Sequence, residues 1–310
     1  MELIVAQQVV VMFLLIGVGI FCGRKGIVTA EATRIYSNFL MVVVMPVMAV
    51  NQFIRTTASD MFGRMGVALL LAVISNGLAV AAATLLIPKR ADRRYRTERL
   101  AATYPNAGFM AFPVLLAVLG QDGLLYGAIF VAVFIIFTWT FGISEASGSR
   151  EISLKKILLN PGVVATAVGV LLFAAKLPVP QVVTDTVGHI ANLNTPLAMV
   201  ITGVFLSELR PGPLLRNRRV YRPVLIKNFL MPLAMTAIIW LLRVPLWLPG
   251  AKEVAVANVI STSCGVAASV ILLTTRTGGD ASHSAGLVAV STACCLLSMP
   301  LAVYIAQLLF

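Results

Sequence analysis

The sequence predicts an all-α polytopic membrane protein with ten transmembrane helices, and three observations support that fold class. Hydrophobic residues make up 59% of the 310 residues, whereas charged residues make up only 12%. The mean hydropathy is +0.95, and a soluble domain of this length needs far more charge on its surface. Ten apolar runs, each near the ~20 residues that cross a bilayer, follow one another along the chain.

Each apolar run is expected to be helical, because lipid offers the backbone no hydrogen-bond partners. The first run has no basic stretch before it and no small-residue cleavage site after it, so we interpret it as a retained span and not as a signal peptide. In chain order the expected spans are 3–22, 37–54, 63–87, 99–119, 123–144, 160–176, 193–208, 223–242, 253–273 and 285–309.

The formal net charge of +12 is explained by topology and does not indicate a nucleic-acid partner. Most of the 24 basic residues lie in or beside the loops after odd-numbered spans. By the positive-inside rule, these loops face the cytoplasm and both termini lie outside. The exceptions are Arg55, Arg64, Lys176, Arg243 and Lys252.

A polar linker near the middle divides the chain into two halves of five spans. The predicted units are a first repeat at 1–146, a cytoplasmic linker at 147–159 and a second repeat at 160–310. Because each half has an odd number of spans, the second half enters the membrane from the opposite side, as in an inverted-topology repeat. Pro46 in span two and Pro196 in span seven are weak echoes of that symmetry.

Span four is expected to be broken. Its sequence "YPNAGFMAFPV" places Gly108 and Pro113 inside an apolar run, and proline removes one helical hydrogen bond and disturbs the preceding residue. We expect half-helices at 99–107 and 113–119, joined by an extended piece at 108–112. Asn106 and Tyr104 lie beside this break, where a free helix N-terminus favours an anion.

Span nine carries a polar run at the corresponding position. Ser261, Thr262, Ser263 and Gly265 interrupt its apolar sequence, although no proline enforces a break there. If both spans break, two positive helix ends meet near the membrane midplane. Helix packing by Asn106 and by the three hydroxyls, and core packing by Tyr104, are the competing interpretations.

The acidic residues favour an organic anion as the substrate. All twelve lie at span ends or in loops, whereas cation exchangers and proton pumps usually place a carboxylate within the membrane. Backbone carbonyls can also bind sodium, so sodium coupling stays open. The four cysteines lack metal-site spacing, and neither a metal nor a cofactor is expected. Lys227 is expected to extend to the cytoplasmic interface, and His283 to lie in a solvated loop.

Four segments resemble the auxin efflux carrier family: "YPNAGFMAFPV" (104–114), "NPGVVATAVGVLLF" (160–173), "NLNTPLAMVITGVFLSE" (192–208) and "GLVAVSTACCLLSMPLAVYI" (286–305). The resemblance implies a scaffold of spans 1, 2, 6 and 7 and a transport domain of spans 3–5 and 8–10. It further implies that spans four and nine cross where a substrate carboxylate binds. Asn106 and Pro113 match the family's crossover motif, while a proline of the plant carriers is missing at 261–265.

That resemblance also implies a biological setting. Plant members export the indole acid auxin and form homodimers, and bacterial members are associated with dicarboxylates such as malate and malonate. The compact length of this chain fits a bacterial inner-membrane member. A homodimer is therefore a possible assembly.

Taken together, these observations predict a secondary transporter that moves a small carboxylate or dicarboxylate across the inner membrane by alternating access. The predicted substrate-binding residues are Tyr104, Asn106, Gly108, Pro113, Ser261, Thr262, Ser263 and Gly265. The alternatives are a sodium-coupled organic anion symporter with a fold like that of the bile-acid symporters, and a channel. An enzyme is not expected, because the sequence has only two histidines, both in loops, and no Gly-x-Ser-x-Gly motif.

Overall fold

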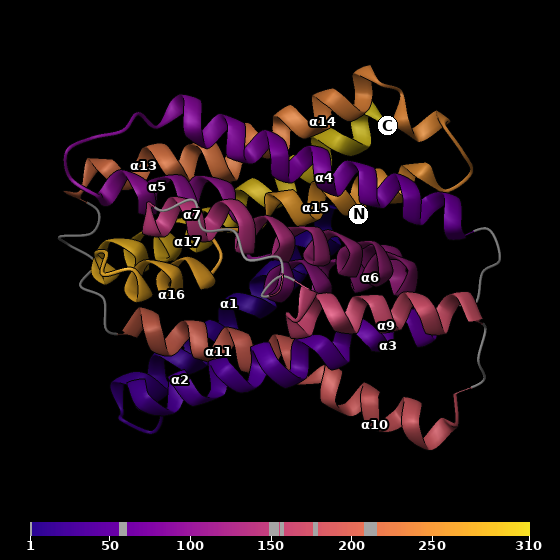
Figure 1. Ribbon diagram of the computed structural model, residues 1–310, viewed down its shortest axis with the longest axis horizontal. Helices are drawn as coiled ribbons and strands as arrows, with labels where there is room; N and C mark the ends of the chain where they lie inside the picture. The colour runs from indigo at the N-terminus through magenta and orange to yellow at the C-terminus, as the bar shows by residue number, and fades with distance from the viewer. Residues whose placement is uncertain (1, 56–60, 149–154, 156–157, 176–178, 208–215) are drawn as a thin grey trace.

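A computed structural model describes residues 2–55, 61–148, 155, 158–175, 179–207 and 216–310 (Figure 1). Every element named within these ranges is helical. The helices are α1 Glu2–Arg24, α2 Ala30–Phe39, α3 Met45–Arg55, α4 Met61–Leu86, α5 Arg94–Thr103, α6 Phe112–Phe137, α7 Ile143–Ser147, α9 Pro161–Ala175, α10 Gln181–Asn192, α11 Asn194–Ser207, α13 Arg218–Leu225, α14 Met231–Leu241, α15 Ala251–Ser263, α16 Ser269–Arg276 and α17 Ala281–Leu309.

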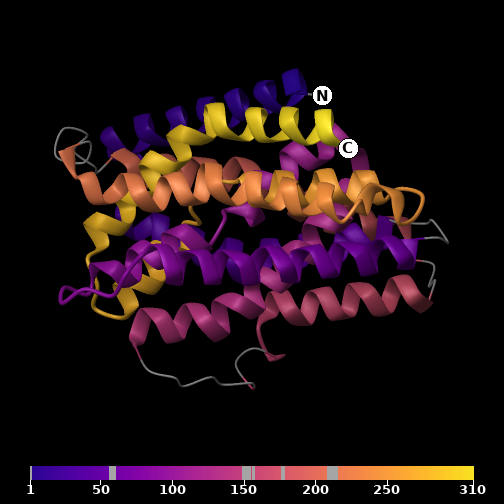
Figure 2. The same ribbon diagram turned by 90° about the horizontal axis from the view of Figure 1, so that it is seen from above.

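Seven helical runs within the described residues are long and apolar enough to cross a membrane, and α9 is a shorter apolar helix. This finding confirms the predicted class of all-helical polytopic membrane protein. The count of ten spans and the division into two repeats remain predictions. In Figure 2 the N- and C-termini lie at the same end of the molecule, and α1 contacts α17.

The helices pack in two groups (Figure 1). In one group α11 contacts α1, α2 and α10, and α3 contacts α9 and α10. In the other group α15 contacts α4, α6, α14 and α17, and α5 contacts α4, α13 and α17. Helices α6 and α17 join the groups through contacts with α1.

Short π-helical turns precede three prolines inside the membrane-spanning runs. Leu40–Val44 precedes Pro46, Ala107–Ala111 precedes Pro113, and Ile226–Leu230 precedes Pro232. A proline cannot donate to the carbonyl four residues back and its ring pushes that carbonyl aside. The wider turn absorbs this disturbance, so these helices continue past the proline.

The helical run at residues 107–147 is interrupted at Gly120. Gly120 has φ 65° and ψ −150°, a conformation that no helix contains. A Cβ built on Gly127 would lie 2.5 Å from Cδ1 of Leu115 and 3.4 Å from a ring carbon of Phe112. In a straight helix Gly127 would lie several turns away from Leu115 and Phe112. Helix α6 therefore folds back on itself at Gly120.

Two basic side chains lie elsewhere than the sequence suggests. Lys227 was expected at the cytoplasmic interface, but only 1% of it is exposed. His283 was expected in a solvated loop, but it lies in the first turn of α17 and is 6% exposed. Its Nε2 is 3.5 Å from Oε1 of Glu98, and its Nδ1 is 3.3 Å from the amide nitrogen of Asn217. Both expectations were wrong because buried acceptors on neighbouring helices replace solvent.

Candidate functional site

The first interrupted helix ends at Thr103 and resumes in the π-turn Ala107–Ala111. The residues between the two helical pieces are 104–106, so the expected position of the break at 108–112 was wrong. Pro105 disfavours helical geometry at the residue before it, and Tyr104 has φ −96° and ψ 110°. Pro113 occupies the first turn of α6, where proline is tolerated.

The second interrupted helix corresponds to the expected span nine. Helix α15 ends at Ser263 and α16 begins at Ser269. Cys264 leaves helical geometry with φ −59° and ψ 147°. The polar run at 261–265 therefore coincides with the end of α15, and no proline is needed to stop the helix.

The two interrupted segments cross as a short antiparallel pair. The backbone N–H of Asn106 donates to the carbonyl oxygen of Gly265 at 2.7 Å, and the N–H of Ala267 donates to the carbonyl oxygen of Tyr104 at 2.9 Å. Pro105 and Val266 face each other between these bonds. Each break thus supplies hydrogen-bond partners for the other, which lipid cannot do.

Polar side chains from three further elements complete the crossing: α17, the π-turn Ile226–Leu230 and α11. The N–H of Val266 donates to Oγ of Ser291 in α17 at 2.8 Å, and that hydroxyl donates to Oδ1 of Asn228. Asn194 at the start of α11 donates through Nδ2 to the carbonyl oxygen of Gly108 at 2.9 Å. Asn194, Asn228 and Ser291 are not among the site residues predicted from the sequence, although a polar residue within an apolar span is a usable signal.

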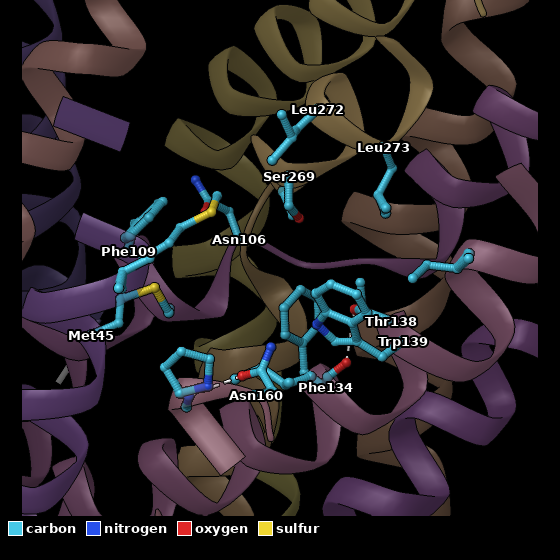
Figure 3. Close-up of a pocket in the computed structure, with 18 of the residues that line it drawn as sticks. Met45, Asn106, Phe109, Phe134, Thr138, Trp139, Asn160, Ser269, Leu272 and Leu273 are labelled. Atoms are coloured by element: carbon cyan, nitrogen blue, oxygen red, sulfur yellow. Dashed lines mark hydrogen bonds between the residues drawn. The ribbon is translucent and has the colours of Figure 1, made fainter. Parts of the chain in front are cut away.

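A cavity of about 370 Å³ lies beside this crossing (Figure 3). Asn106 and Ser269 lie on one side of it, and Phe134, Trp139 and Asn160 lie on the other. Its further lining residues are Asn38, Met41, Val42, Met45, Pro105, Gly108, Phe109, Ile135, Thr138, Ile143, Pro161, Gly162, Ala267, Leu272, Leu273, Arg276 and Thr277.

Only some of the predicted site residues reach this cavity. Asn106 and Gly108 line it, and Pro113 does not. Tyr104 is buried, and its hydroxyl donates to the carbonyl oxygen of Phe137 at 3.0 Å. Gly265 is buried within the crossing. The remaining three residues are buried, and their hydroxyls donate to carbonyl oxygens of their own helix: Ser261 to Ala257, Thr262 to Asn258 and Ser263 to Val259.

The cavity has a positive electrostatic character at the crossing. The π-turn at Ala107 and the helix α16 both begin there, and no side chain caps either N-terminus. Free N–H groups at a helix start carry about half a positive charge in total. Oγ of Ser269 is buried and has no hydrogen-bond partner among the residues that the structure describes. Among the described lining residues Arg276 is charged, and none is acidic.

Two comparisons with known proteins agree with this architecture. The profile of the family described as "Membrane transport protein" matches residues 4–303. An uncharacterized transporter of Methanocaldococcus jannaschii, MJ1031, is 24% identical over 211 residues, which cover 64% of this chain and 68% of the relative. The chain therefore belongs to the membrane transport protein family, which is the auxin efflux carrier family, and is a transporter and not an enzyme.

Proposed function

We propose that the protein is a secondary carrier that moves a small organic anion across the inner membrane by alternating access. One observation carries this proposal: two uncapped helix N-termini, Asn106 and the unpartnered hydroxyl of Ser269 border one cavity. A carboxylate placed there can accept hydrogen bonds from the first N–H groups of these helices, which have no acceptor within their own helix. The acceptor-only carboxylates of Asp and Glu, which suit a cation, are missing from the described lining.

Ten crossings account for the described helices. Six of the long runs cross once, and α9 adds one more. The turn at Gly120 separates the end of span four from span five, and α15 with α16 forms span nine. This count supports two inverted repeats of five, with a scaffold of spans 1, 2, 6 and 7 and a transport domain of the others.

The orientation follows from charge. Arg276 lines the cavity at the end of α16, beside a loop that the positive-inside rule places in the cytoplasm. On this assignment both termini are extracytoplasmic and the cavity faces inward. The homodimer implied by the resemblance stays a prediction.

The lining favours a particular kind of anion. Large apolar side chains line the cavity around the polar crossing, among them Met41, Met45, Phe109, Phe134 and Trp139. A single carboxylate on an apolar body matches one polar end and apolar walls. A second carboxylate against these apolar walls would cost several kcal/mol unless it reached Arg276, the charged residue of the described lining.

The first test is a thermal-shift screen of the purified protein with phenylacetate, benzoate, malonate and succinate. We expect the monocarboxylates to raise Tm more than the dicarboxylates do. Asn106→Ala should abolish the ligand-induced shift while Tm without ligand stays close to that of the wild type. Asn192→Ala, at an exposed position outside the lining, is the matched control and should respond as the wild type does. Stabilisation by amines or sugars alone would contradict an anion site.

The second test separates a carrier from a channel and from a sodium symporter. Proteoliposomes preloaded with unlabelled phenylacetate should accumulate labelled phenylacetate by counterflow, and uptake should saturate. A channel shows neither behaviour. Replacing sodium with choline abolishes uptake only by a sodium-coupled symporter.

A further inference from the structure

Lys227 is a buried basic residue at the carbonyl end of an interrupted helix. It lies in the π-turn Ile226–Leu230 between α13 and α14, and only 1% of it is exposed. Its Nζ donates a hydrogen bond of 2.7 Å to the carbonyl oxygen of Thr262. Thr262 belongs to the last turn of α15, directly before that helix breaks. The side chain therefore joins span eight to the crossing.

The carbonyl end of α15 needs external partners. The last four carbonyls of a helix have no intrahelical donor, and together they carry about half a negative charge. The side chains of Thr262 and Ser263 do not serve here, since their hydroxyls donate to carbonyls one turn earlier. Lys227 donates to the carbonyl oxygen of Thr262, and the thiol of Cys295 lies 3.7 Å from the carbonyl oxygen of Ser263. Of these two donors only the Lys227 ammonium carries a charge.

Within the described residues no carboxylate forms an ion pair with Lys227. A buried ammonium is costly unless negative charge offsets it. The carbonyl end of α15 supplies such a partial charge, and the 2.7 Å contact has the length of a charge-assisted hydrogen bond. The buried basic side chain thus has a partner of opposite partial charge, as ionisable residues within membrane proteins usually do.

In carriers with interrupted helices, the carbonyl ends of the half-helices commonly coordinate a coupled sodium ion. Here an ammonium group occupies that kind of position. We propose that Lys227 is the resident cation of the crossing, so that the carrier needs no sodium ion to complete its substrate site. Lys227 is thus a positioning residue, because it acts through α15. This inference rests on the proposed carrier function and defines its ion requirement.

The test of sodium uses the wild-type protein and no transported solute. Binding of radioactive sodium to purified protein is measured by scintillation proximity, and Tm is compared in sodium chloride and choline chloride at equal ionic strength. We expect no saturable sodium binding and the same Tm in both salts. Saturable binding, or a sodium-specific rise in Tm, would overturn the proposal.

The test of the charge uses Lys227→Met and Lys227→Arg. Met removes the charge and leaves an unbranched side chain that is one atom shorter, whereas Arg keeps the charge. We expect Lys227→Met to lower Tm by several degrees more than Lys227→Arg does. Equal Tm values for the two variants would show that the side chain serves only to fill space.

Chemical rescue provides a readout that a purely packing role would not give. Lys227→Ala leaves room for a small cation, so ethylammonium should restore most of the lost Tm and choline should not. The wild type and Lys252→Ala, an exposed position on α15, should show no difference between the two salts. If neither ethylammonium nor sodium restores the Tm of Lys227→Ala, the assignment of Lys227 as a resident cation is wrong. If the variant does not fold, the wild-type sodium test still decides.

Failure of the carrier function gives a different result. If the wild type transports no carboxylate, the proposed carrier function is wrong, whatever the sodium test shows. If phenylacetate is transported only in the presence of sodium, the carrier function is supported and the proposed role of Lys227 is wrong.

Discussion

The N–H of Asn106 donates to the carbonyl oxygen of Gly265 at 2.7 Å, and this bond joins the two interrupted helices. The antiparallel partner of this bond runs from Ala267 to Tyr104. Neither break can exist alone in lipid, because its backbone groups would lose several kcal/mol of hydrogen bonding. Disturbing one broken helix should therefore disturb the other.

Two glycines at the crossing should respond differently to alanine. A Cβ on Gly265 would lie 3.0 Å from Sγ of Cys295 and 3.3 Å from the backbone of Ser291, whereas a Cβ on Gly108 would meet only the flexible end of Met45. We expect Gly265→Ala to lower Tm and Gly108→Ala to leave it nearly unchanged. Because Gly108 and Met45 line the cavity, Gly108→Ala should weaken the thermal shift by phenylacetate more than that by smaller acetate. Equal Tm values for both variants would contradict the described packing.

Ser291→Ala should destabilise the protein by about 1–3 kcal/mol, the cost of leaving a buried polar group without its partner. The substitution removes the acceptor of the Val266 N–H and the donor to Asn228. The fall in Tm on thermal denaturation measures this loss of stability. Ser298→Ala is the matched control, since Ser298 is equally buried on α17 but only accepts a longer bond of 3.3 Å from Asn228. A larger loss for Ser298→Ala would refute this role of Ser291.

Much of the fold could be predicted from sequence, because the bilayer constrains it so strongly. Long apolar runs must be helical, and the polar residues of span four predict an interruption. The position of that interruption was missed because two prolines compete. Pro105 acts on Tyr104 in the middle of the run, while Pro113 lies in a first helical turn, where its missing N–H is harmless.

The candidate site was predictable only in part. Asn106 and Gly108 line the cavity, but sequence spacing does not reveal where a hydroxyl on a helix points. Ser261, Thr262 and Ser263 donate back to their own helix, a common option for Ser and Thr. Lys227 was misplaced because its acceptor, the carbonyl of Thr262, comes from another span, and such pairing depends on tertiary structure.

Asp92 and Arg219 form an ion pair between the start of α5 and α13, and the pair should give a pH-dependent stability. The hydrogen bond from Arg219 lowers the pKa of Asp92 below its ordinary value of 3.8. A carboxylate whose pKa is lowered by folding stabilises the protein above its unfolded pKa, and this contribution disappears as pH falls through the folded pKa. Arg219→Gln should therefore lower Tm slightly at neutral pH, and the difference should vanish in strong acid.

The same difference should shrink in high salt, because Asp92 is exposed to solvent and such pairs are screened. Arg218→Gln removes a neighbouring exposed charge for which the described residues offer no ion-pair partner. Its effect on Tm should not depend on pH in the acid range. A Tm difference for Arg219→Gln that grows on acidification would have the wrong sign for this pair.

Gly203→Ala should separate α1 from α11 and strongly reduce the folded yield. A Cβ on Gly203 would lie 2.1 Å from the carbonyl oxygen of Ile16 and 2.7 Å from Cα of Gly19. Both neighbours are backbone atoms, so the helices themselves must move apart and their side-chain packing is lost.

Gly17→Ala is the matched control on α1, since a Cβ there has no atom within 4 Å. Its Tm should equal or exceed that of the wild type, because alanine favours a helix over glycine by about 1 kcal/mol. Monodisperse yield in detergent and Tm of both variants measure the contrast. A Gly203→Ala protein as stable as Gly17→Ala would mean that α1 and α11 do not pack glycine against glycine in the membrane.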